Sequence, residues 1–390
     1  MHSSEPAGKQ SLWPLLVATL IVQSGFGTIL PLLPLFVKDR GLPLSWLGLM
    51  AAIYALVAFI GQLLFGPLSD SWGRKRLLVA GTLLSTVGTV LFLVPVAPAY
   101  YLLFRALQGL GVAAFIPAAN ALVADRVAPD RRGRAFALLS SFYMAGFALG
   151  PMIGGLASTI GGLSTPFEVG AVLNLAATFA VVFGVREAGA VQRFASRAAQ
   201  HGGPVSIPWS QLGRWLIMNF GWMGLGGMYD ATWSIYMARL GATHIVIGLS
   251  WTLFALPYLL FNFLAGRLAD HAARRSALIY FGAALNGVIV ILYTVSDSPW
   301  LSIALSVAEA VAMSLITPAL SADVMSHASD ATRGKVQGIF QSSGTLGSFF
   351  MALLSGYLLP YGPKIALGAG AALLFLSMAG SWIWGALAAV

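Results

Sequence analysis

The sequence predicts an all-α integral membrane protein in which twelve membrane-spanning helices form two six-helix bundles related by pseudo-twofold symmetry. Of its 390 residues, 58% are hydrophobic and only 9% are charged, whereas about a quarter of the residues in soluble domains are charged. Apolar runs of about 20 residues recur, which is the length that a helix needs to cross a bilayer. Their hydrophobicity does not alternate at every second residue as in a barrel strand, so the runs predict helices.

Twelve apolar runs are expected to span the membrane, with short polar turns between them. They cover residues 13–37, 45–66, 77–95, 99–123, 135–157, 167–185, 213–237, 245–266, 277–295, 299–322, 335–358 and 365–388. The first run is longer than the apolar segment of a signal peptide, and no small-residue cleavage site follows it. It is therefore expected to be a retained helix.

The basic residues indicate how the chain is oriented. Most of the 22 Lys and Arg residues fall on one side of the membrane if the N-terminus lies on that side. Because Lys and Arg mark the cytoplasmic side, we expect both termini in the cytoplasm and a multi-pass location in the cell inner (plasma) membrane. The formal net charge of +9 then needs no nucleic acid partner.

One long hydrophilic connection divides the chain into two halves. Residues 1–185 are expected to form an N-terminal six-helix bundle, 186–212 a cytoplasmic linker and 213–390 a C-terminal six-helix bundle. The linker begins with an Ala-rich stretch that is either a short helix at the membrane surface or a plain flexible connection. Gly66 and Asp70 align with Gly266 and Asp270, and such a repeat is typical of transporters whose solute site lies between the halves.

A polar and basic turn at residues 66–78 separates the second and third runs. Gly66 and Gly73 permit tight backbone geometry, and Asp70 lies at a helix end, where a carboxylate can meet the dipole of a neighbouring helix. The alternative is that the basic residues of this turn only set the topology. In the second copy Ala273 stands where the first has Gly73.

Two further patterns lie inside predicted spans. Arg105 is about 9 Å from the outer end of its span, at 1.5 Å per residue, and an ionisable residue at such a place is a functional candidate; the alternative is that its side chain reaches the outer surface. The fifth span carries five residues that let a neighbouring helix come close or bend the helix. They are Gly146, Gly150, Pro151, Gly154 and Gly155.

These patterns together resemble the major facilitator superfamily and, within it, the twelve-span drug:proton antiporters. The resemblance covers essentially the whole chain and is carried by Gly66, Leu68, Asp70, Gly73, Arg74 and Lys75, by Arg105, Gln108, Gly109 and Gly111, and by the glycines and proline of the fifth span. It implies a conformational latch in which Asp70 braces the halves near Gly334 and Arg74 pairs with Asp125. It also implies export, because relatives that export carry the pattern from Gly146 to Gly155.

A proton-driven mechanism needs a protonatable group within the spans, and only Asp230 and Glu309 qualify. A carboxyl group with access to alternating sides could load and release a proton. We therefore expect proton coupling through Asp230, Glu309 and Arg105. The alternative is a hydrogen-bonded structural acid or, for Asp230, an acid at the membrane interface. Many members of the family carry an acid in the first span, and this chain has none.

The substrate cavity is expected near the midplane, lined by aromatic and a few polar side chains. Such a lining suits an amphipathic or cationic organic solute, although packing or lipid contact explains each residue equally well. The candidates are Gln23, Phe26, Tyr54, Asn120, Tyr143, Trp222, Trp233, Trp251, Tyr258, Asn262, Gln337 and Gln341.

The sequence favours a monomeric secondary transporter over an enzyme. It contains no cysteine, no Walker sequence and no Gly-x-Ser-x-Gly motif, so neither a cofactor nor a metal is expected and the proton gradient is the expected energy source. The leading hypothesis is a proton-coupled exporter of amphipathic small molecules of the multidrug type, working by alternating access. The alternatives are an exporter or flippase of one physiological solute such as a sugar, siderophore or lipid, and a non-transporting membrane receptor or scaffold.

Overall fold

The computed structural model describes residues 11–128, 131–186, 209–328 and 333–387, without the side chains of Pro67, Asp70 and Arg333. This part of the chain is helical throughout and contains no strand. The first half contains α1 (Trp13–Ile29), α2 (Leu33–Asp39), α3 (Ser45–Trp72), α4 (Arg74–Leu91), α5 (Pro98–Arg126), α6 (Arg132–Gly161), η2 (Gly162–Ser164), α7 (Thr165–Phe179) and η3 (Ala180–Gly184). The second half contains α8 (Trp209–Arg239), α9 (His244–Ala269), α10 (Ala272–Val295), α11 (Pro299–Ser326), α12 (Arg333–Leu358), η4 (Leu359–Tyr361) and α13 (Pro363–Leu387).

Nine segments of the described residues are long and apolar enough to cross a membrane. The runs expected at 135–157 and 167–185 fall within one of them, Arg134–Gly184. The runs expected at 77–95 and 213–237 correspond to α4 and α8, which are not among the nine, because these helices carry more polar residues. The count of twelve spans therefore stays a prediction, although the all-helical membrane architecture is confirmed.

The first expected span is broken into two helices. α1 ends at Ile29 and α2 begins at Leu33. Pro31 and Pro34 lie at this break, and proline supplies no backbone N–H for a helical hydrogen bond. The residues between the two helices remain buried, so the chain continues through the bundle with a change of direction.

The internal repeat is visible in the backbone of the turns. Gly41 and Gly241 both have positive φ, at 73° and 84°, and each lies between the end of one helix and the start of the next. Gly73 also has positive φ, at 97°, where α3 meets α4. No residue other than glycine has positive φ in the described residues, so Ala273 does not reproduce the turn at Gly73.

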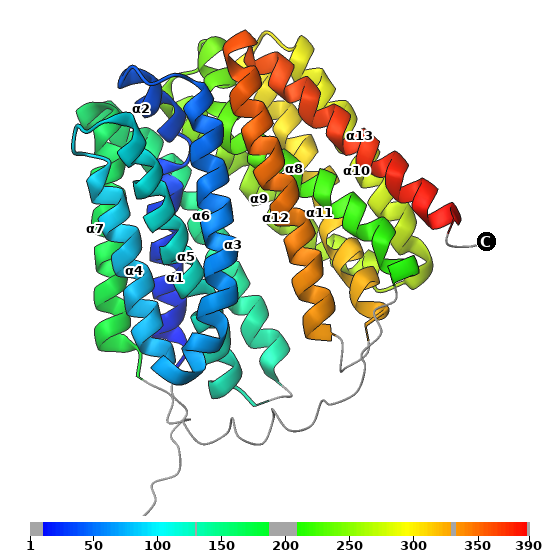
Figure 1. The fold of residues 1–390 in the computed structure, drawn as a ribbon, viewed down its shortest axis with the longest axis horizontal. Coiled ribbons are helices and arrows are strands. Elements are labelled where there is room, and N and C mark those ends of the chain that lie inside the picture. Colours follow the sequence, from blue (N-terminus) through cyan, green and yellow to red (C-terminus); the bar gives the residue numbers. More distant parts are fainter. Residues whose placement is uncertain (1–10, 129–130, 187–208, 329–332, 388–390) are drawn as a thin grey trace, which may run out of the picture.

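The two halves cross closely at one end of the molecule, through two pairs of helices. A Cβ atom added to Gly48 of α3 would meet the carbonyl oxygen of Ala352 and lie 2.6 Å from the Cα of Gly356, both in α12. At the equivalent place in the repeat, a Cβ on Gly248 of α9 would meet the carbonyl oxygen of Pro151 in α6. Figure 1 shows the halves close together near α2 and diverging toward the opposite end. We call the end with these two glycine crossings the closed end.

Gly48→Ala is expected to destabilise the contact between the halves by about 1–3 kcal/mol, because the new methyl group meets backbone atoms that cannot rotate away. The measurement is the apparent melting temperature of the purified protein in detergent, which should fall. Gly226→Ala is the matched control, because nothing lies within 4 Å of a Cβ at that helical glycine. Equal melting temperatures for the two variants would contradict the tight crossing at Gly48.

Candidate functional site

Three charged side chains lie deep among the helices, away from both ends. Arg105 of α5 and Glu309 of α11 are each only 2% exposed, and Asp230 of α8 is partly buried. A charge placed there is costly unless other groups compensate for it. The surroundings of each one therefore indicate what it can do.

Glu309 is held by two tyrosines of its own half. The hydroxyl of Tyr229 donates to Oε1 at 2.5 Å, and the hydroxyl of Tyr293 donates to Oε2 at 2.7 Å. Among the described residues, no Lys, Arg or His nitrogen lies within 4 Å of this carboxylate. Glu309 thus accepts from two tyrosines and has the side chain of Asn286 beside it, and no cation of the described residues compensates its charge.

A small cavity of about 40 Å³ opens beside Glu309. Its lining consists mainly of aromatic side chains, together with two serines and the carboxylate: Tyr229, Trp233, Ser250, Trp251, Phe254, Ser306 and Glu309. Trp233 donates from Nε1 to Ser250 Oγ at 2.9 Å, whereas Nε1 of Trp251 is buried without a partner. A carboxylate among aromatic rings suits a proton or a small organic cation.

Arg105 is fixed by polar and aromatic neighbours of the first half. Its Nη1 donates to Gln108 Oε1 at 2.8 Å, and Gln108 Nε2 donates to Thr89 Oγ1 at 3.1 Å. The guanidinium carbon lies 4.4 Å from the ring centroid of Tyr54. Nε is buried and has no hydrogen-bond partner.

Arg105 and Asp230 face each other across the two halves. Their charges attract each other electrostatically, yet within the described residues the two side chains form no ion pair at 4 Å or less. Asp230 therefore has its nearest compensating charge on the opposite half. Glu309 has no such partner, so the two acids differ in their surroundings.

A larger cavity, of about 250 Å³, lies in the first half. It is lined by Thr19, Phe115, Ile116, Ala119, Asn120, Leu139, Ser140, Tyr143 and Met144, from α1, α5 and α6. The side chain of Tyr143 lies beside that of Gln23. This mainly apolar lining with a few polar groups includes two of the predicted cavity residues, Asn120 and Tyr143.

The remaining cavity candidates have varied surroundings. Trp222 and Gln23 are buried, Gln341 is exposed and Gln337 is intermediate. Tyr258 donates to Thr317 Oγ1 at 3.2 Å, and Oδ1 of Asn262 is buried without a partner. Phe26 stacks on Tyr54. The role of each of these residues in substrate binding stays a prediction.

The proposed latch is partly within the described residues. Arg74 Nε donates to Asp125 Oδ2 at 3.1 Å, and Arg74 Nη1 donates to Ser69 Oγ at 2.5 Å. Lys75 Nζ donates to the carbonyl oxygen of Val182, which attaches the turn to η3. A Cβ on Gly66 would meet nothing within 4 Å. The side chain of Asp70, for which a contact near Gly334 is expected, lies outside the described residues.

The glycines of the fifth span let α6 contact two helices at once. Gly146, Gly150 and Gly154 pack against the backbone of α1, at Leu20, Ser24 and Thr28 respectively. Gly155 instead faces α9, where a Cβ would lie 3.5 Å from the Cα of Gly248. The pattern thus joins α1 to α6 within the first half and α6 to α9 across the halves. Its relation to export stays a prediction.

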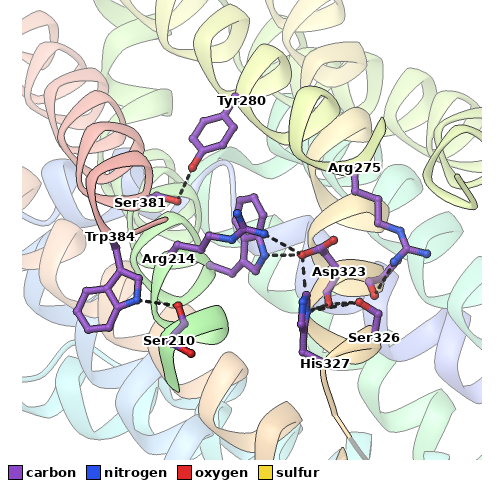
Figure 2. A network of polar contacts seen from close by, with 11 residues as sticks. Ser210, Arg214, Arg275, Tyr280, Asp323, Ser326, His327, Ser381 and Trp384 are labelled. Carbon is purple, nitrogen blue, oxygen red and sulfur yellow. Dashed lines mark hydrogen bonds and ion pairs between the residues drawn. The ribbon is translucent and has the colours of Figure 1, made fainter. Parts of the chain in front are cut away.

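Sequence reasoning missed a polar network at the opposite end of the second half, shown in Figure 2. Asp323 Oδ2 accepts from Trp215 Nε1 at 2.6 Å and lies 3.6 Å from Arg214 and 3.8 Å from His327. These contacts fasten the start of α8 to the end of α11. The spacing of Asp323 and His327, one helical turn apart, was the only sequence signal for it.

Comparison with known proteins identifies the family. The model of the Major Facilitator Superfamily matches residues 15–229 and again residues 215–388. The tetracycline resistance protein, class B, of Escherichia coli is 26% identical over 362 residues, which cover 88% of each chain. The quinolone resistance protein NorA of Staphylococcus aureus (strain MRSA252) is 32% identical over 158 residues, 40% of this chain and 41% of NorA.

Solved structures share the same fold at low sequence identity. The nucleoside transporter NupG (D323A mutant) has a TM-score of 0.79 at 11% identity and covers 95% of this chain and 99% of its own. The human organic anion transporter MFSD10 has a TM-score of 0.67 at 18% identity, with coverages of 96% and 99%. The chain therefore belongs to the Major Facilitator Superfamily and is a multi-pass membrane transporter of small molecules rather than an enzyme.

Proposed function

We propose that this transporter is a proton-coupled exporter of amphipathic small molecules and works by alternating access. The names of two relatives, resistance proteins for tetracycline and for quinolones, support the export of drug-like compounds. The proton gradient is the energy source, and the protein acts as a monomer in the inner membrane with both termini in the cytoplasm.

The observation that carries the proposal is the environment of Glu309. A carboxylate that is 2% exposed, accepts two tyrosine hydroxyls and has no basic side chain of the described residues within 4 Å needs a counter-charge from elsewhere. A proton or the cationic group of a substrate supplies it. Since both compete for one carboxylate, the binding of one releases the other, which is what an antiporter requires.

The arrangement of the halves fits one step of an alternating-access cycle. With the termini in the cytoplasm, the closed end at Gly48 and Gly248 faces outward, and the proposed access of the solute is then from the cytoplasmic side. Residues 1–185 and 213–390 then move as two bodies joined by the linker at 186–212. The cavity at Asn120 and Tyr143 lies in the first half, where it can receive the apolar part of a solute.

An exporter of one specific physiological solute is the second candidate. The small volume of about 40 Å³ beside Glu309 favours it, because a tight pocket selects for shape more strongly than an open one. A narrow profile in an efflux screen across many compounds would support this alternative. A receptor or scaffold without transport receives no support from the structures of similar fold, which are named as an organic anion transporter and a nucleoside transporter.

Cells that express the protein should accumulate less of a fluorescent amphipathic cation such as ethidium than control cells. An uncoupler that collapses the proton gradient should restore the accumulation to the control level, because the gradient drives export. The measurement is cell-associated fluorescence over time. Efflux that continues unchanged in the presence of the uncoupler would contradict proton coupling.

Glu309→Gln is expected to abolish proton-gradient-driven transport in proteoliposomes, because the amide neither takes up a proton nor compensates a cation. Tyr293→Phe, which removes one of the two hydroxyl donors, should reduce transport less. Glu168→Gln is the matched control, since Glu168 is exposed in the first turn of α7. Gradient-driven transport by Glu309→Gln at the rate of the control would exclude Glu309 as the coupling site.

A further inference from the structure

Three aromatic and charged side chains form a continuous stack inside the first half. The rings of Phe26 and Tyr54 have centroids 5.4 Å apart at an interplanar angle of 21°. The guanidinium carbon of Arg105 lies over the ring of Tyr54, 4.4 Å from its centroid. The three residues come from α1, α3 and α5. We propose that Tyr54, backed by Phe26, is a positioning residue that holds Arg105 toward Asp230, so that the charge on Asp230 responds to the approach of the two halves.

Two contacts fix the guanidinium of Arg105, and one of its N–H groups has no partner among the described residues. The guanidinium carbon lies over the ring of Tyr54, and Gln108, itself held by Thr89, accepts from Nη1. A long side chain with several rotatable bonds loses its freedom when both contacts are made. The buried Nε–H that has no partner is left as the unsatisfied donor, and an unpaired donor of this kind is costly.

The carboxylate of Asp230, in the second half, interacts electrostatically with Arg105. Tyr54 of α3 interacts electrostatically with both members of the pair and with Tyr143 of α6. Tyr229 precedes Asp230 in α8. Tyr229 is already bonded to Glu309. The electrostatic energy of Arg105 and Asp230 therefore depends on the distance between α5 and α8.

The helices α5 and α8 belong to different halves, whereas all members of the stack belong to the first half. Phe26, Tyr54, Gln108 and Arg105 lie in the first half, whereas Asp230 lies in the second. When one half moves against the other, a fixed guanidinium changes its distance to Asp230 by the full displacement. A loose guanidinium would follow the carboxylate and weaken that response. Tyr54 therefore acts on Asp230 through Arg105.

The ring of Tyr54, not its hydroxyl, makes the contact with Arg105. A cation is attracted to the face of any aromatic ring, so phenylalanine can replace tyrosine here, whereas leucine fills the space without attracting the cation. This difference separates the proposal from a simple role in packing. The inference rests on the proposed proton coupling, and its test measures the two separately.

The chain contains no cysteine, so spin labels can be placed at two chosen sites without removing any residue. Tyr100 and Trp300 are 54% and 61% exposed and lie near the starts of α5 and α11, one in each half. Tyr100→Cys and Trp300→Cys would report the separation of the halves at the closed end by pulsed electron paramagnetic resonance. The labelled protein is measured in lipid nanodiscs at acidic and at alkaline pH, without substrate.

The labelled wild type and Tyr54→Phe should both change their distance distribution with pH. Tyr54→Leu should lose at least about two thirds of that change, because the cation–π contact is gone. Phe65→Leu, which removes another partly buried ring from the same helix, should respond as the wild type does. If Tyr54→Leu cannot be purified, Phe26→Leu removes the ring behind Tyr54 and should give a smaller loss.

The results distinguish the proposed proton coupling from the positioning role of Tyr54. A wild type that does not respond to pH would overturn the proposed proton coupling and this inference with it. A wild type that responds, together with an equal response of Tyr54→Leu, would overturn the positioning role alone. An equal loss in Phe65→Leu would also overturn it, because the effect would then follow from the loss of any ring in α3.

Discussion

Backbone contact between α3 and α12 and between α6 and α9 is the constraint on which the relation of the two halves depends. In lipid, apolar side chains gain little from association because the surroundings are equally apolar, so helices are held together by close packing. Gly48 with Gly356 and Gly248 with Gly155 allow that close approach at equivalent places of the repeat. The bond from Thr252 Oγ1 to the carbonyl oxygen of Ala148, at 2.6 Å, adds a directional contact to the second crossing only.

The same glycine pattern has two tasks in α6. Gly146, Gly150 and Gly154 fasten α6 to α1 within the first half, whereas Gly155 supplies the contact with α9. The helix α6 therefore packs within the first half and also forms part of the contact between the two halves. Its equivalent in the second half, α12, packs on α8 through Gly347 and on α3 through Gly356. At the positions equivalent to Gly150 and Pro151, α12 has Met351 and Ala352, and both of these contacts are nevertheless made.

The sequence was sufficient to predict the features that depend on residues close together along the chain. It predicted the helical membrane architecture, the turn at Gly73 and the three buried charged residues, because hydropathy, glycine and isolated charges are local signals. It did not reveal which side chains meet across helices. The stack of Tyr54 on Arg105 and the contact of Trp215 with Asp323 join residues 51 and 108 positions apart. Such pairs follow from the packing of whole helices, and one sequence carries no pattern for them.

Glu309 and Asp230 differ in which half of the protein provides the side chains that interact with them. Glu309 is bonded by Tyr229 and Tyr293, which belong to its own half, so its surroundings change little when the halves move and chiefly when something enters the cavity beside it. Asp230 has its counter-charge on Arg105 of the other half, so its surroundings change whenever the halves move. The surroundings of Glu309 thus depend on whether the cavity is occupied, and those of Asp230 depend on the relative position of the halves. A transporter that links the binding of a proton or solute to movement needs both, and this chain places them on two helices of one half.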